Sequence, residues 1–133
     1  MINHVSIGVS DIGRAKAFYD GALQPLGYAC LSNGDSSLGY GKDGVVLWIS
    51  HTKSPVKTDP ASGLHFCFDA PTRKSVDAFH KAALAAGGRD NGKPGLRRDY
   101  GDNYIETVWG RGYVLRDPPV ESANAQRKLA KVQ

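Results

Sequence analysis

Hydrophobic and polar residues alternate over residues 63–69, which is the pattern of a strand that buries one face. A leucine and two phenylalanines fall on one face, whereas His65 and Cys67 fall on the other. Apolar residues at helical spacing follow, behind Thr72 as a good N-cap residue, and this pattern ends at a pair of glycines. The stretch therefore predicts a strand followed by a helix.

The beginning of the chain repeats this pattern. Residues 2–9 alternate as a strand, and a helical pattern runs from residue 12 or 14 to residue 23. A shift of 61 positions, which carries His4 onto His65, superposes the two copies. The other coinciding pairs are Phe18 with Phe79, Ala22 with Ala83, Leu23 with Leu84 and Gly27 with Gly88. The chain is predicted to be a tandem repeat of one unit, with a histidine on the strand face that the helix does not cover.

Further strands complete each unit. Their patterns cover residues 28–31, 38–41, 45–50, 104–109 and 113–115. Residues 89–103 show little strand pattern, so the second unit is expected to lack or alter one strand. We expect a single domain over residues 1–119, made of a first module (1–52) and a second module (62–119), and then a basic tail (120–133).

Composition narrows the classes of function. The 133 residues carry a net charge of +4 without a basic stripe interleaved with aromatic residues, which argues against nucleic acid as a partner. No apolar run approaches the roughly 20 residues of a membrane span. The start of the chain lacks the features of a signal peptide, so a cytoplasmic protein is expected. The two cysteines, Cys30 and Cys67, are expected to be reduced and buried.

Several stretches resemble the glyoxalase, bleomycin-resistance and extradiol dioxygenase superfamily, also called the vicinal oxygen chelate proteins. Residues 2–11 (INHVSIGVSD) are similar to the first strand of these proteins, residues 63–68 (GLHFCF) to the fifth and residues 105–108 (IETV) to the last. The resemblance implies an α+β fold of paired βαβββ modules, in which a curved, cup-like mixed sheet has its helices outside.

The resemblance also implies a metal site made of His4, His65 and Glu106, with Glu106 in a catalytic role. Two imidazoles and one carboxylate suit a divalent Fe, Mn, Ni or Zn ion, which can chelate two vicinal oxygens of a substrate. Each histidine can instead be an ordinary polar residue on a half-exposed sheet. In a second register, residues 104–109 are the third strand of their module and Glu106 is not a ligand. Residues 45–50 offer no carboxylate where related isomerases place a ligand.

Five further residues are candidates for substrate binding. Trp48 and Tyr40 could form an aromatic wall of the cup, or belong to the core. Cys67 shares the strand face of His65, although a buried structural thiol is the alternative. Arg97 and Tyr100 could hold an anionic substrate, or lie in a solvated loop.

Two classes of function follow. The first is a metalloprotein acting on a small oxygen-rich substrate, as a lactoylglutathione lyase-like isomerase or lyase or as a ring-cleaving dioxygenase. The second is a metal-free protein that sequesters an antibiotic or metabolite, as in bleomycin resistance. A missing strand would leave a sheet edge open, so we expect a homodimer in which residues 104–115 or the tail contact the partner.

Overall fold

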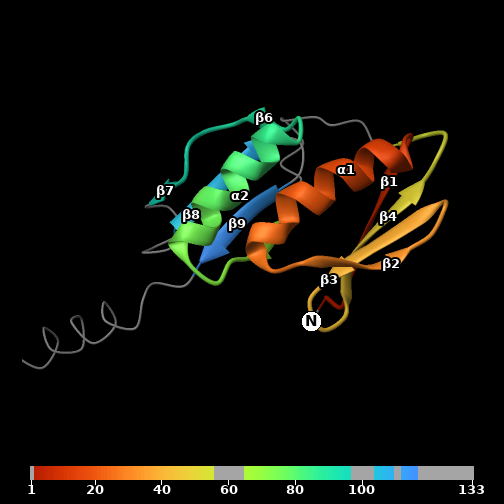
Figure 1. Cartoon of the computed structure of the whole chain (residues 1–133), viewed down its shortest axis with the longest axis horizontal. Helices are drawn as coiled ribbons and strands as arrows, with labels where there is room; N and C mark the ends of the chain where they lie inside the picture. The colour runs from red at the N-terminus through yellow and green to blue at the C-terminus, as the bar shows by residue number, and fades with distance from the viewer. Residues whose placement is uncertain (1, 56–64, 97–103, 110–111, 117–133) are drawn as a thin grey trace, which may run out of the picture.

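The first half of the chain folds as a strand, a helix and three more strands. The structure is a computed structural model that describes residues 2–55, 65–96, 104–109 and 112–116, the last two ranges by their backbone alone. The first module, red to yellow in Figure 1, contains β1 (Val5–Val9), α1 (Ile12–Leu23), the 3-10 turn η1 (Gln24–Leu26), β2 (Ala29–Asn33), β3 (Ser37–Gly41) and β4 (Val45–His51). These strands form the first sheet, in the order β1-β4-β3-β2, with β1 parallel to β4 and the other pairs antiparallel.

The second module repeats this order with a divided second strand. It contains β5 (Cys67–Asp69), α2 (Arg73–Ala85), β6 (Arg89–Asp90), β7 (Gly95–Leu96), β8 (Tyr104–Trp109) and β9 (Gly112–Arg116). The second sheet has the order β5-β9-β8-β6, and β7 also pairs with β8. β5 is parallel to β9, as β1 is to β4. The paired βαβββ architecture expected from the sequence is confirmed.

The internal repeat holds in register as well as in order. A shift of 61 positions carries Ile12, where α1 begins, onto Arg73, where α2 begins. β8 and β9 stand in the places of β3 and β4, and β6 and β7 together replace β2. The second module is therefore altered rather than short of a strand. Residues 104–109 are its third strand, as in the second of the two registers considered from the sequence.

The two helices share one core between the modules. α1 and α2 lie side by side and contact each other (Figure 1), α1 also packs on β2, β3 and β4, and α2 packs on η1 and β8. The core consists of Val9, Ala15, Tyr19, Ala22, Leu23, Leu26, Leu38, Tyr40, Leu47, Ile49, Phe68, Val76, Phe79 and Ala83. Burial of this apolar surface is the main force that holds the modules together.

Local sequence sets where both helices begin. The Asp11 side chain accepts a hydrogen bond from the Arg14 backbone N–H at 2.9 Å, which caps α1. Thr72 and Ser75 form a capping box on α2, in which each side chain accepts from the other residue's backbone N–H at 3.0 Å. Thr72 was expected as this N-cap from its sequence alone.

The first sheet is bent by two irregularities in its register. Pairing shifts between Cys30 and Ser32 on β2, and again between Tyr40 and Gly41 on β3. Such bulges increase local twist and curve a sheet. At the second one, a Cβ atom on Gly41 would overlap the backbone carbonyl oxygen of Gly44, so the tight β3–β4 turn depends on glycine.

Some expectations concern residues outside the described part of the chain. The linker between the modules falls largely on residues 56–64, and the tail lies within residues 117–133, so their organisation stays a prediction. Among the described helices, neither is long and apolar enough to cross a membrane.

Candidate functional site

The two histidines expected to share a metal lie just ahead of the first strand in each module. His4 precedes β1, is exposed, and its Nδ1 lies 2.9 Å from Oδ1 of Asn3. His65 precedes β5 and is exposed as well. Their equivalence in the repeat is confirmed, but they precede strands of different sheets. That they bind one ion stays a prediction.

Glu106 lies on the third strand of the second module. It is paired with Val114 on β9, and Val114 is paired with Phe68 on β5. Residues in register on neighbouring strands share a sheet face. Phe68 is a core residue, whereas its exposed neighbours Cys67 and Asp69 belong to the adjacent rows. Glu106 therefore occupies the row of the buried phenylalanine, not the rows of the exposed face of β5.

A three-donor metal site does not fit the described residues of one chain. Neither β4 nor β9, the fourth strand of each module, contains an Asp or Glu. Among the residues described with side chains, no group of three or more His, Cys, Asp or Glu could hold a metal ion. The predicted set of His4, His65 and Glu106 stays a prediction, because Glu106 is described by its backbone alone.

Trp48 lies on the face of the first sheet that α1 does not cover, hereafter the uncovered face. Its neighbours on β4, Leu47 and Ile49, are buried in the core, and alternation directs Trp48 to the opposite side. Trp48 is paired with Ser6 on β1 and with Gly39 on β3, and its side chain is half-buried. Trp48 is therefore an aromatic residue on a half-exposed sheet face. Of the two interpretations of the sequence, the aromatic wall of the cup required this position.

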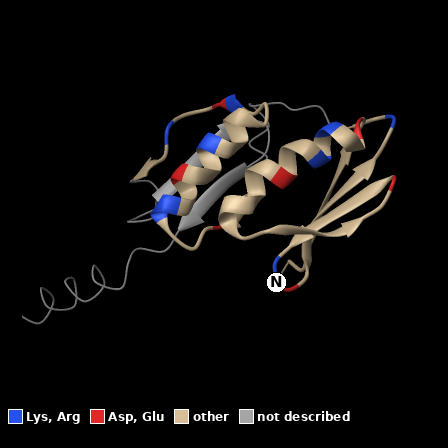
Figure 2. Cartoon of the chain, in the orientation of Figure 1, with Lys and Arg blue, Asp and Glu red and all other residues tan. Residues whose placement is uncertain are grey.

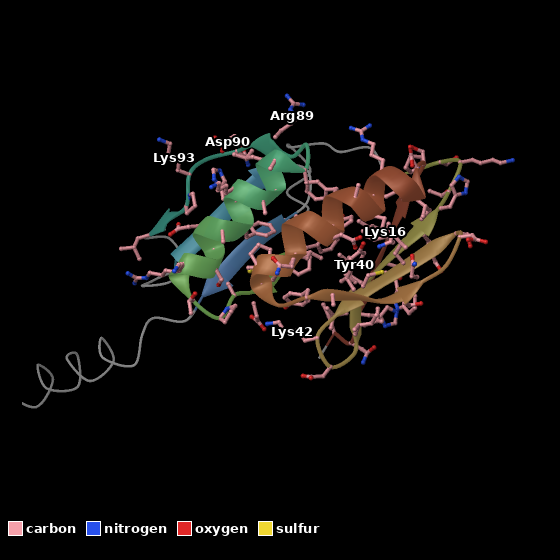
Figure 3. The ribbon with its side chains drawn as sticks, viewed as in Figure 1. Lys16, Tyr40, Lys42, Arg89, Asp90 and Lys93 are labelled. Atoms are coloured by element: carbon pink, nitrogen blue, oxygen red, sulfur yellow. The ribbon has the colours of Figure 1, made fainter. Side chains whose placement is uncertain are left out.

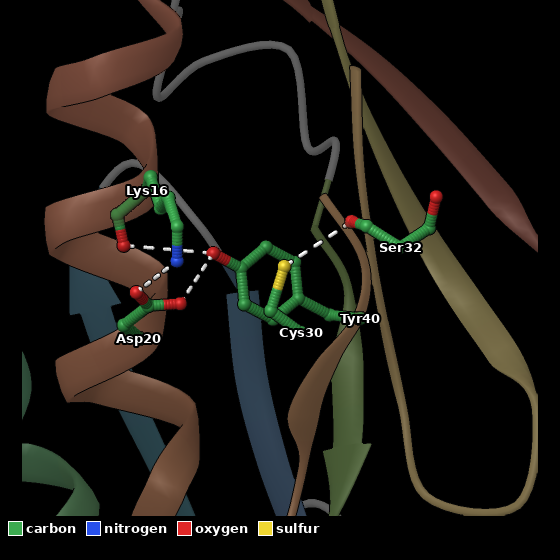
Figure 4. Close-up of polar contacts among 5 residues, drawn as sticks. All are labelled: Lys16, Asp20, Cys30, Ser32 and Tyr40. Carbon is green, nitrogen blue, oxygen red and sulfur yellow. Dashed lines mark hydrogen bonds and ion pairs between the residues drawn. The ribbon is translucent and has the colours of Figure 1, made fainter. Parts of the chain in front are cut away.

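Tyr40 lies on the other face of the first sheet and is a core residue. Only 1% of it is exposed, so its expected place in the cup wall is wrong. Its hydroxyl donates a hydrogen bond to Oδ1 of Asp20 on α1 at 2.8 Å, and Oδ2 of Asp20 pairs with Nζ of Lys16 at 2.5 Å (Figure 4). The alternation pattern of β3 could not predict that Tyr40 is buried. Tyr40 has a glycine on each side, and glycine does not indicate which face of a strand is apolar.

The electrostatics of this cluster are those of a structural contact. Burial raises the pKa of Tyr40, and its hydrogen bond to the Asp20 carboxylate raises it further. The hydrogen bond to Asp20 also raises the pKa of Lys16. Cys30 lies beside this group, and its thiol donates to the backbone oxygen of Ser32 at 3.2 Å (Figure 4). A phenol held protonated in this way anchors α1 to the sheet.

The remaining candidates fall in different places. Neither cysteine forms a disulfide. Cys67 is exposed on β5, an edge strand of the second sheet, so the expectation of a buried thiol is wrong there. Cys30 is half-buried. Arg97 and Tyr100 lie outside the described residues, and their proposed contact with an anionic substrate stays a prediction.

Sequence reasoning missed a contact between the modules at Tyr28. Its ring meets Phe68 of β5 edge-on, with centroids 5.7 Å apart, and Nζ of Lys42 stands 4.6 Å from the centroid of the Tyr28 ring. Burial and the nearby Asp69 charge raise the pKa of Tyr28. Lys42 belongs to the β3–β4 turn, as Figure 3 shows at the lower side of the molecule. The feature of the sequence that could have indicated this contact is an aromatic residue directly after Gly27, which adopts the left-handed backbone conformation.

A hydrogen bond between two side chains joins α2 to the residues that follow it. Nε2 of His80 lies 3.2 Å from Oδ1 of Asp90, which also accepts from the Gly92 backbone N–H at 2.9 Å. The His80 side chain is only 15% exposed. The Gly92 hydrogen bond, and then His80, lower the pKa of Asp90. Figure 3 shows Asp90 between Arg89 and Lys93 on this segment.

The Asp90 contacts give an expected pH dependence. A carboxylate whose pKa is lowered on folding stabilises the fold above its unfolded pKa, about 3.9, and loses that contribution as the pH falls through its folded value. We expect Asp90→Asn to make the thermal midpoint less sensitive to acid below about pH 4, while Asp43→Asn in the exposed β3–β4 turn serves as the matched control. An unchanged acid profile in Asp90→Asn would contradict this role.

Solved structures with the same architecture come from several bacteria. A glyoxalase/bleomycin resistance protein from Albidiferax ferrireducens T118 is 28% identical, with a TM-score of 0.72 over 87% of this chain and 98% of that one. A glyoxalase-related enzyme from Fulvimarina pelagi is 16% identical, with a TM-score of 0.68 over 89% and 88% of the two chains. A glyoxalase/bleomycin resistance protein/dioxygenase family enzyme from Burkholderia phytofirmans PsJN is 18% identical, with a TM-score of 0.61 over 86% and 95%.

Comparison with sequences adds little to this likeness. No protein-family model matches the chain. The cell cycle transcriptional regulator CtrA of Caulobacter vibrioides is 43% identical over 60 residues, or 43% of this chain. The chain spans only about a fifth (21%) of the length of that curated relative. The structural likeness therefore carries the argument.

Proposed function

By its fold the chain belongs to the glyoxalase, bleomycin-resistance and extradiol dioxygenase superfamily, and from this we propose that it binds a small oxygen-rich molecule without a metal. The ligand lies on the uncovered face of the first sheet, against Trp48. One observation carries the proposal: an aromatic ring stands half-buried on this face, in register with Ser6 on one side and Gly39 on the other. An indole ring with a neighbouring hydroxyl suits a flat molecule that bears oxygen atoms.

A metal-dependent lyase, isomerase or dioxygenase is the second candidate. The equivalence of His4 and His65 favours it, because both are exposed and each precedes the first strand of its module. The fourth strands, which contain no carboxylate, weigh against it. The metal-free binding protein is therefore proposed ahead of the metalloenzyme.

Trp48 provides the test. The chain has two tryptophans, so Trp109→Phe leaves Trp48 as the sole indole fluorophore. We expect catechol to change this fluorescence, and we expect Trp48→Ala to weaken catechol binding, measured by calorimetry, by about tenfold or more, since an aromatic contact contributes about 0.5–1.5 kcal/mol beyond its buried area. Trp109→Phe should bind as the unaltered protein does.

Equal affinities in Trp48→Ala and the unaltered protein would remove Trp48 from the site. Metal content decides between the two candidates. A stoichiometric Fe, Mn, Ni or Zn ion in protein purified without chelators, absent from His65→Ala, would favour the metalloenzyme instead.

We also propose that the protein is a homodimer. The reason is the open edges of the two sheets rather than a missing strand. Among the described strands, β1 and β5 each pair with one neighbour only, so each leaves a sheet edge open. A second copy that pairs along these edges would extend both sheets and enclose the uncovered face. Light scattering should give twice the chain mass for the full chain. A monomer at that concentration, for the full chain and for a chain ending at Pro119, would exclude the dimer.

A further inference from the structure

The first sheet has no charged strand residue. None of the residues of β1, β2, β3 and β4 is Lys, Arg, Asp or Glu. Figure 2 shows these strands in tan, with blue and red only at their connecting turns and on α1. The second sheet differs, since Asp69, Arg89, Asp90, Glu106 and Arg116 all lie on its strands. The strands of the first sheet are thus free of acidic and basic residues, whereas those of the second carry both.

Among the described strands, the residues in register with Trp48 and in the row on the Ser50 side are uncharged. Gly39 is overlaid by Val45, whose Cγ2 would stand 2.9 Å from a Cβ atom at that glycine. In the next row, Gly8 is overlaid by Thr52, whose Cγ2 would stand 2.6 Å from such an atom. Ser50 completes this row, paired with Gly8 and Ser37. Trp48 is therefore bordered by hydroxyl groups and by aliphatic carbon.

We infer that the ligand of this face is an uncharged, flat molecule with hydroxyl or carbonyl oxygens, such as a sugar ring joined to an aromatic ring. The inference rests on the proposed function and narrows its ligand class. A charged group laid on this sheet would lose hydration and find no opposite charge among the strand residues, which costs free energy. Neutral oxygens can exchange water for the serine hydroxyls, and a ring can stack on Trp48. Anionic thiol adducts are therefore disfavoured on this face.

Two probes that differ by one charge test the inference. Phenyl β-D-glucopyranoside and phenyl β-D-glucuronide share their rings, but the second carries a carboxylate in place of the hydroxymethyl group. Each is titrated into Trp109→Phe protein labelled with 5-fluorotryptophan, so that the single ¹⁹F resonance reports on Trp48. We expect the glucoside to bind at least about tenfold more tightly than the glucuronide.

A charge added to the face should change this preference. Ser6 is exposed and is paired with Trp48, so Ser6→Lys places an ammonium group beside the ring. We expect this variant to bind the glucuronide at least about threefold more tightly than its parent does. Ala17→Lys is the matched control, because it adds the same net charge on exposed α1 and should leave both affinities unchanged.

Each outcome has one meaning. Equal affinities, or tighter binding of the glucuronide by the parent protein, would overturn the neutral-ligand inference and leave the proposed function standing. A resonance that neither probe shifts, at concentrations up to solubility, would overturn the proposed function itself. Both titrations are made at one fixed protein concentration, because the proposed dimer would itself shift the resonance.

Discussion

Replacing Tyr40 with alanine is expected to cost about 3–5 kcal/mol of unfolding free energy, as is usual when a buried aromatic residue is truncated. Tyr40 is 1% exposed and its ring lies 5.6 Å from that of Tyr19, so the substitution opens a cavity between α1 and the first sheet. Urea unfolding followed by circular dichroism measures the loss. The effect is large relative to the total stability of a small domain.

Tyr40→Phe separates the ring from the hydroxyl. It removes the hydroxyl's hydrogen bonds to Oδ1 of Asp20 at 2.8 Å and to the backbone oxygen of Lys16 at 3.5 Å. The Asp20 side chain is 44% exposed and can be hydrated instead. The expected loss is about 1 kcal/mol. A loss in Tyr40→Phe as large as that in Tyr40→Ala would mean that the hydroxyl, and not the packing of the ring, holds α1 on the sheet.

Gly41→Ala is expected to destabilise the protein by about 3 kcal/mol or more, at the upper end of what overpacking costs. The added Cβ would overlap the carbonyl oxygen of Gly44, which belongs to the backbone and cannot turn aside as a side chain can. The β3–β4 turn would have to open, and the adjacent Tyr40 to Leu47 pairing would be disturbed. The thermal midpoint by calorimetry reports this change.

Gly44→Ala is the matched control in the same turn. A Cβ at Gly44 would meet no heavy atom within 4 Å, and its φ angle is not in the left-handed region. We expect a change within about 0.5 kcal/mol. If both substitutions lowered the midpoint equally, flexibility of the turn rather than the overlap would be the cause.

Position in the repeat proved a better guide to the fold than to the site. The shift of 61 positions placed the start of α2 correctly, and the structure shows that both modules pair their first and fourth strands in parallel. Equivalent apolar faces are buried in equivalent ways. The same shift made His4 and His65 equivalent but says nothing of how the modules are joined. α1 and α2 pack between them, so the first strands belong to separate sheets.

The sequence by itself determined the module order and both helices, because these follow from local periodicity and capping. The tertiary structure decided the rest. β6 and β7 pair with β8 although their residues carry almost no strand pattern, because the partner strand supplies the hydrogen bonds. Tyr40 lies in the core, where its hydroxyl donates a hydrogen bond to Asp20, a residue 20 positions away in the sequence. Glu106 was placed in the row of Phe68 by the register of β9. Each of these depends on long-range pairing, which a single chain's local pattern does not encode.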